Sequence, residues 1–355
     1  RKAAKKLELE INRLDGNQEK IDYYNYILGT MTPAASQTPF LRKRSVCFFP
    51  HNEEMEARWY YNPEYWAAYF DKLSADRFNA FSLTFGHQTA YLVPPYSFLV
   101  AMPEFPEVSV PTLSEEQREQ NLGALQMIAR TATERGIDFT FGVWQQHSYE
   151  YGDSLVEGLT VDNLAAYCAL GMTKVLQACP DIVGVQLRVN AESGIELNDS
   201  PEFFRELYAG IAAAGRPIEI DCRAKAIADD TWESAIATGL PTTVSTKFWC
   251  EHQGMPYHAG LLQDFDRVTR RHTYGDLLKY PRDHEFLFRL WNMGTNKFTL
   301  WADPTWVSEF ARNCALGGSK GFEVCAPLSN KGFRNVGGYW PLFKPSELQW
   351  YEHED

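Results

Sequence analysis

Short strand-like segments alternate with longer helical segments along this chain, and this alternation limits the possible folds more than any other feature. The strand segments are identified by period-2 patterning or by their β-branched and aromatic content. They are residues 45–50, 79–86, 137–144, 183–190, 217–222, 242–249, 298–302 and 321–325. Helical periodicity separates most of them, in residues 63–76, 114–135, 160–178, 201–214, 229–238, 276–291 and 304–316.

Eight such units predict a parallel α/β fold. The number of units in 355 residues favours a closed (β/α)8 TIM barrel over an open sheet. The absence of a GxGxxG or Walker-type loop after the first strand also argues against a nucleotide-binding fold. We expect the barrel in residues 45–355 and an N-terminal helix and linker in residues 1–44. Because the tail after Cys325 lacks a clear eighth helix, we expect the chain to stop before its natural end. Additional domains outside this chain are among the expected partners.

The composition excludes several classes of protein. With 45% hydrophobic and 23% charged residues, the chain is globular, and its net charge of −12 argues against nucleic-acid and anionic-membrane partners. No apolar run is long enough for a membrane helix, and the basic start at Arg1 is not followed by the apolar segment of a signal peptide. The sequence leaves a periplasmic and a cytoplasmic location open. Seven scattered Cys without a CxxC predict neither a disulfide framework nor structural zinc, and no cofactor is expected.

The fourth strand segment carries the clearest polar row. Apolar Val183, Val185, Leu187 and Val189 alternate with polar Gln186, Arg188, Asn190 and Glu192. Both faces of a parallel sheet are buried, so a polar row is costly unless its groups are paired or meet a ligand. Glu192 lies at the C-terminal end of this strand, where barrel enzymes hold their active sites.

Applied to every strand, the same alternation turns a charged set toward the barrel axis. Its members are the bases Arg188, Arg223 and Lys247 and the acids Glu192, Asp221, Glu251, Asp303 and Glu323. Opposite charges can pair, so part of the set is expected to be a structural ion network. Because acids recur at several strand ends, we also predict a functional pocket there. Other candidates for contact with a substrate are Trp144, His147, Asn190, Trp249, His252 and Trp301.

Two carboxyl groups across a polar pocket are the groups that glycoside hydrolysis requires. We assign Glu192 as the general acid, and Glu251 as the base or nucleophile. Arg188, Arg223 and Lys247 would bind an anionic sugar such as a uronic acid through charge-assisted hydrogen bonds. The expected partner is therefore an oligosaccharide or a polysaccharide.

Three motifs resemble the xylan α-glucuronidases of glycoside hydrolase family 67. The segment from Pro180 to Gly194 resembles the family's fourth-strand motif, P-D-x-x-G-F followed by K-A-[DN]-S-E-G. Cys222-Arg223-Ala224 resembles W-R-A on the fifth strand, and Val244-Ser-Thr-Lys247 resembles V-Q-I-K on the sixth. The resemblance implies that Glu192 is the acid, that Arg223 contacts a substrate carboxylate and that Lys247 lies in the pocket. It also implies an inverting mechanism. Glu251 does not match the family's next segment in register and rests on strand alternation.

Two other interpretations fit the same residues. A metal-dependent sugar isomerase or epimerase could use Glu192, Asp221, His252 and Glu323 as ligands, although the neighbouring Arg and Lys would repel a cation. A barrel that binds sugar without catalysis would also present a polar pocket.

Overall fold

The structure is a computed structural model. It describes residues 38–50, 59–85, 95–146, 156–189, 193–196, 198–224, 229–247, 285–290 and 304–325, together with Gln18, Asp22, Ala57 and Ile227. The chain divides into two units, Arg1–Phe40 and Leu41–Asp355, and nearly all of the described residues belong to the second. Within this described part, no helix combines the length and the apolar character that crossing a membrane requires.

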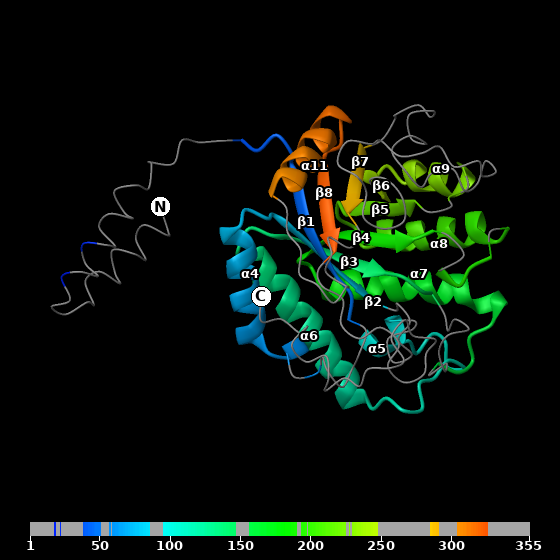
Figure 1. The fold of residues 1–355 in the computed structure, drawn as a ribbon. Coiled ribbons are helices and arrows are strands. Elements are labelled where there is room, and N and C mark those ends of the chain that lie inside the picture. The colour runs from blue at the N-terminus through cyan, green and yellow to red at the C-terminus, as the bar shows by residue number, and fades with distance from the viewer. Residues whose placement is uncertain are drawn as a thin grey trace, which may run out of the picture. The chain divides into compact units, whose positions relative to one another are not determined.

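Eight parallel strands form a closed barrel in which each strand pairs with the next and β8 pairs with β1 (Figure 1). The strands are β1 (Lys43–Phe48), β2 (Ala80–Phe85), β3 (Asp138–Val143), β4 (Ile182–Arg188), β5 (Glu219–Ala224), β6 (Thr242–Lys247), β7 (Glu285–Leu290) and β8 (Gly321–Cys325). This topology, with helices between the strands, confirms the predicted (β/α)8 barrel.

All but one of the described helices begin and end close to where the sequence predicts; the exception, Tyr96–Leu99, falls in a segment for which no helix is predicted. They are α4 (Pro63–Ala75), α5 (Tyr96–Leu99), α6 (Glu115–Thr133), α7 (Val161–Ala178), α8 (Ser200–Ala212), α9 (Asp229–Ala237) and α11 (Pro304–Leu316). Asn62 caps α4 by accepting hydrogen bonds from two backbone N–H groups, and Ser114 forms a capping box with Gln117 at α6. Gly136 and Gly215 follow α6 and α8 with φ values of +71° and +77°, a conformation that favours glycine after a helix.

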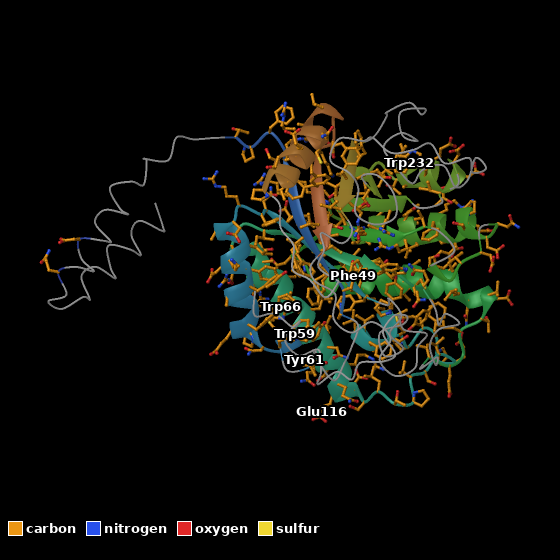
Figure 2. The ribbon with its side chains drawn as sticks, viewed as in Figure 1. Phe49, Trp59, Tyr61, Trp66, Glu116 and Trp232 are labelled. Carbon is orange, nitrogen blue, oxygen red and sulfur yellow. The ribbon has the colours of Figure 1, made fainter. Side chains whose placement is uncertain are left out.

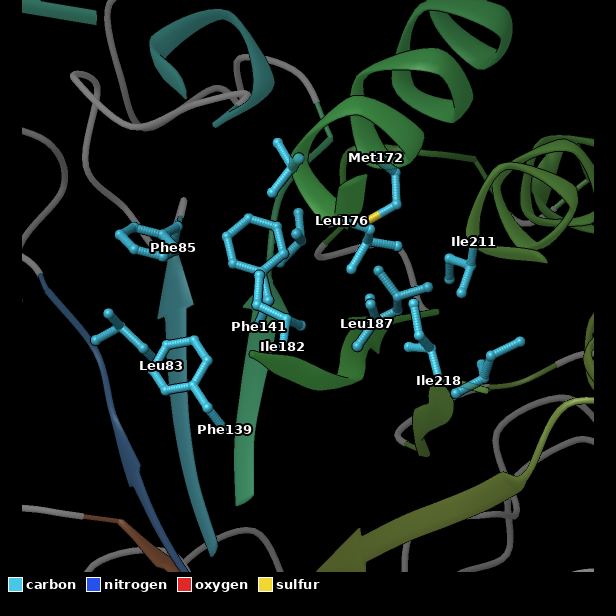
Figure 3. Close-up of a cluster of buried hydrophobic side chains, with 14 of the residues drawn as sticks. Leu83, Phe85, Phe139, Phe141, Met172, Leu176, Ile182, Leu187, Ile211 and Ile218 are labelled. Carbon is cyan, nitrogen blue, oxygen red and sulfur yellow. The ribbon is translucent and has the colours of Figure 1, made fainter. Parts of the chain in front are cut away.

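The main hydrophobic core lies between the outer face of the strands and the helices. Figure 3 shows one part of it, in which Phe141 and Leu187 from the strands face Met172 and Leu176 of α7 and Ile211 of α8. All five side chains are fully buried. The apolar side chains of each alternating strand thus pack outward against the helices, and the polar side chains point into the barrel.

Aromatic side chains cover the outer side of the first strands. Trp66 of α4 stacks on Phe70 and meets Phe81 of β2 edge to face, and Trp59 packs against both Trp66 and Phe48 of β1. Figure 2 shows Trp59 and Trp66 beside α4. Many of the aromatic residues are thus core residues rather than candidates for sugar stacking.

The seventh strand differs from the prediction. The barrel uses Glu285–Leu290, which lies inside the predicted helix 276–291, whereas the predicted strand 298–302 lies outside the described residues. Phe286, Phe288 and Leu290 join the outer core, and the intervening Leu287 and Arg289 are also buried. Because both alternating sets contain apolar residues, the segment also satisfies a helical pattern, and this caused the error.

Val183 is a second correction. It was expected on the buried apolar face of β4, but its side chain is 40% exposed. The pairing of β3 with β4 changes register between Phe139 and Thr140, so Val183 is an extra residue between the paired Ile182 and Gly184. The alternation beyond it is as predicted, with Val185 and Leu187 buried in the outer core.

Candidate functional site at the C-terminal end of the barrel

The stagger of the strands sets the height of each interior side chain. In a barrel of this kind, inward side chains from alternate strands lie in common layers of four. When the strand pairing is followed around the barrel, one middle layer contains Ser82, Gln186, Ser245 and Glu323, and the next layer toward the C-terminal ends contains Cys47, Gly142, Arg223 and Arg289. Arg188 lies one layer further toward those ends.

A buried polar network centres on the amide of Gln186. Its Nε2 donates to Asp221 Oδ2 at 2.9 Å and to Glu323 Oε2 at 3.1 Å, and its Oε1 accepts from Arg289 Nη1 at 2.7 Å. Arg289 also forms an ion pair with Glu323 at 2.5 Å, and Ser82 Oγ donates to the same carboxylate at 2.7 Å. The amide thus joins two carboxyl groups that differ in their partners.

The two carboxyl groups differ in pKa. Burial alone would raise the pKa of Glu323, but Arg289 and the hydrogen bond from Ser82 hold it below its usual range. Burial raises the pKa of Asp221, and although Lys43 and Arg289 oppose this change, the pKa stays above its usual range. Neighbouring carboxyl groups with opposite shifts are typical of sites that move protons, although structural networks produce them too.

Two arginines meet one tryptophan above this network. Arg188 Cζ lies 4.0 Å from the centroid of the Trp144 ring, and Arg223 Cζ lies 5.6 Å from it. Phe49, which follows β1 and is labelled in Figure 2, packs edge to face on Trp144 and lies 5.7 Å from Arg188 Cζ. Both arginines are buried to 2% exposure or less, so these cation–π contacts lie away from solvent, where they are strongest.

The structure therefore brings together three of the predicted site residues, Arg188, Arg223 and Trp144. Asp221 and Glu323 lie deeper in the barrel, and their hydrogen bonds go to side chains of the barrel itself. Lys247 ends β6, where only its backbone is described. The other candidates lie outside the described residues: His147, Asn190, Glu192, Trp249, Glu251, His252, Trp301 and Asp303.

Sequence reasoning missed Arg289. This side chain is fully buried, forms the ion pair with Glu323 and donates from Nη2 to Cys47 Sγ at 3.4 Å. It was missed because its segment was assigned to a helix. The alternation of Phe286, Phe288 and Leu290 around it was the signal that could have revealed the strand.

The N-terminal end of the barrel holds a second charged cluster. Lys43 Nζ lies 2.7 Å from Glu219 Oε2, Lys320 pairs with the other oxygen of Glu219, and Lys320 Nζ lies 3.6 Å from Glu285 Oε2. Burial opposes ionisation, but the two lysines lower the pKa of Glu219, and the carboxylates similarly raise that of Lys43. Among the residues that the structure describes, neither end contains three His, Cys, Asp or Glu side chains placed to hold a metal ion.

Neither a protein-family model nor a curated protein matches the sequence. Among solved structures, the chain resembles a glycoside hydrolase family 138 enzyme targeting pectin rhamnogalacturonan II, with a TM-score of 0.63 and 15% identity over 89% of this chain and 39% of that one. The matched region is less than half the length of that enzyme. This chain is a TIM barrel.

Two further similar structures are also glycoside hydrolases. One is the exo-β-1,4-mannosidase Op5Man5 from Opitutaceae bacterium strain TAV5, with a TM-score of 0.48 and 13% identity over 79% of this chain and 51% of that one. The other is a family 20 β-N-acetylglucosaminidase, with a TM-score of 0.47 and 12% identity over 82% and 64%.

Proposed function

We propose that this chain is the barrel of a glycoside hydrolase that removes a uronic acid or another side-chain sugar from a larger glycan. The observation that carries the proposal is the pair of buried guanidinium groups, from Arg188 and Arg223, that meet the ring of Trp144 at the C-terminal end of the strands. Barrel enzymes place their catalytic groups at this end.

The chemistry of these groups suits an acidic sugar. A guanidinium presents paired N–H donors in a plane, which match the two oxygens of a carboxylate. An indole face is apolar, as are the C–H faces of sugar rings. Arg188, Arg223 and Trp144 would therefore fix both the charge and the orientation of a uronic acid. The similar family 138 enzyme targets a pectin, and pectins carry carboxylate groups, which supports this substrate class.

In this proposal Glu192 is the general acid, and Glu251 is the base or nucleophile. Glu192 follows Arg188, the last residue of β4, by four residues in the sequence. The acid donates a proton to the leaving oxygen while the second carboxylate activates water or attacks the anomeric carbon. Carboxyl groups about 5 Å apart would give retention, and groups roughly 6.5–9.5 Å apart would give inversion.

The test is a screen of the protein against oligosaccharides that bear uronic acids, with the product anomer followed by NMR. We expect Glu192→Gln to lower kcat by about 10²-fold or more on substrates with poor leaving groups, because general acid assistance is lost. Glu196→Gln is the matched control, since Glu196 is an exposed acid on the same segment. Equal activity of the Glu192 variant and the wild type would contradict the proposal, as would stoichiometric divalent metal in the active protein.

A further inference from the structure

The carboxyl group of Asp221 forms no ion pair with the residues that the structure describes. Its side chain is only 1% exposed, and its Oδ2 accepts one hydrogen bond, from the neutral amide of Gln186. Among the described residues, no donor reaches Oδ1 and no cation lies within ion-pair distance of Asp221. A buried carboxylate with one neutral partner is costly, whereas a carboxylic acid is tolerated.

The two cations that lower the pKa of Asp221 are engaged with other carboxylates. Lys43 of β1 lies 2.7 Å from Glu219, and Arg289 of β7 lies 2.5 Å from Glu323. The two anions they pair with, Glu323 of β8 and Glu219 of β5, themselves disfavour a charge on Asp221. Lys43 and Arg289 favour a negative charge on Asp221. The net electrostatic effect on its pKa therefore depends on how fully Glu219 and Glu323 offset these two cations.

Neutral groups face Asp221 from the strands on either side. β4 contributes the amide of Gln186, and the residue paired with Asp221 on β6 is Thr243, whose hydroxyl donates to Glu219. Because Arg289 donates to Oε1 of Gln186, the Nε2 side of that amide is fixed toward Asp221 and Glu323. The amide can thus donate to Oδ2 of a neutral carboxylic acid whose proton is on Oδ1. The raised pKa of Asp221 agrees with this geometry.

We infer that Asp221 is a neutral carboxylic acid inside the barrel and that its proton is linked to the binding of an anionic sugar at Arg188 and Arg223. The linkage rests on the proposed function. Arg223 lies two residues beyond Asp221 on the same strand, so both side chains point into the barrel. An anion held there would repel a carboxylate at Asp221 and would favour its protonated form. By reciprocity, protonation of Asp221 would strengthen the binding of the anion.

The experiment labels the aspartate carboxyl carbons with ¹³C and follows their NMR signals from pH 5 to pH 9 in the whole chain. Asp221→Asn identifies the signal of Asp221 by its loss. We expect Asp221 to be protonated at pH 5, where an ordinary Asp, with a midpoint of about 3.9, is ionised. Saturating glucuronate should move the midpoint of Asp221 upward by about one pH unit, which corresponds to roughly tenfold tighter binding to the protonated form. Glucose at the same concentration is the matched neutral ligand and should leave the midpoint in place.

The Kd of glucuronate gives the second measurement. It should increase as the pH rises through the midpoint in the wild type and should stay constant in Asp221→Asn, whose side chain cannot ionise. A carboxylate signal for Asp221 at pH 5 overturns the inference. So does a protonated Asp221 with a pH-independent Kd for glucuronate. If the signal shows a protonated Asp221 but neither protein binds glucuronate, the proposed acidic substrate fails and the linkage fails with it, whereas the neutral carboxyl group stands.

Discussion

The two ends of the barrel interior use buried charge in different ways. At the N-terminal end, Lys43 and Lys320 hold Glu219 between them, so positive and negative groups offset one another. At the C-terminal end, Arg188 and Arg223 lie against aromatic rings. The first arrangement is an ion cluster made of side chains of the barrel itself. The second places two guanidinium groups beside an indole ring, at the end of the barrel where the proposed sugar carboxylate would bind.

The interior has room for these long side chains because the opposite wall is lined with small residues. Strands β1 to β3 contribute Ser45, Ser82, Thr140 and Gly142, whereas most of the charged groups come from β4 to β8. A Cβ at Gly142 would collide with the side chain of Thr84. Most barrels fill this space with branched apolar residues, and this one fills it with a polar network. The network links β2, β4, β5, β7 and β8 across the interior.

The largest effect is expected where the two ends meet, at Glu323. Glu323→Gln should lower the free energy of unfolding by about 3–5 kcal/mol, because it leaves the fully buried guanidinium of Arg289 without its carboxylate. Denaturant unfolding at pH 7 measures this change. The matched control is Glu309→Gln, which removes an acid paired with Arg312 at 2.9 Å on the surface of α11 and should cost less than about 1 kcal/mol. Equal losses would show that the interior pair is no more important than a surface pair.

A smaller effect, on activity, is expected at the C-terminal end. Arg223→Met removes the charge but keeps an unbranched side chain, and we expect kcat/KM on a uronic-acid substrate to fall roughly 10- to 100-fold, the range for a hydrogen bond to a charged group. Arg205→Met, which removes an exposed arginine of α8, is the control. On a substrate with a neutral sugar in place of the uronic acid, kcat/KM of the Arg223→Met variant should fall much less. If both substrates lost activity equally, Arg223 would support the fold rather than bind a carboxylate.

The sequence predicts which side chains turn inward better than it predicts their partners. The alternation in β4 and β5 is enough to turn Arg188, Asp221 and Arg223 inward, because strand geometry alone determines the side. It cannot indicate which groups pair, since pairing depends on the stagger between strands far apart in the sequence. The Glu323–Arg289 pair joins β8 to a segment that also satisfies a helical pattern. The bulge that exposes Val183 depends on the neighbouring β3 and leaves no local signal.

At the N-terminal end, Glu219→Gln should destabilise the protein by about 2 kcal/mol at pH 7, less than the Glu323 change because a fifth of the Glu219 side chain is exposed. The pKa of Glu219 is lowered in the folded state. Its stabilisation is therefore present above the pKa of an unfolded Glu, about 4.3, and is lost as the pH falls toward the folded value. Urea unfolding at pH 7 and near pH 3 should show the difference between variant and wild type shrinking in acid.

The control for Glu219 is Glu104→Gln, which removes an exposed acid that also lies 2.7 Å from a lysine, Lys174. It should have a smaller effect at pH 7 than Glu219→Gln. A cost for Glu219→Gln that stays constant with pH would mean that the variant disturbs packing rather than charge.

The smallest effect is expected at Asp221, between the two ends. Asp221→Asn should change stability at pH 7 by less than about 1 kcal/mol, because the new amide oxygen can still accept the hydrogen bond from Gln186. The pKa of Asp221 is raised in the folded state, so its contribution is favourable below the pKa of an unfolded Asp and is lost as the pH rises through the folded value. The stability of the variant relative to the wild type should therefore increase with pH, which is opposite to the trend for Glu219→Gln. If the stability changes of Asp221→Asn and Glu219→Gln followed the same trend with pH, Asp221 would be ionised like Glu219. The middle of the barrel would then resemble the ion-paired N-terminal end.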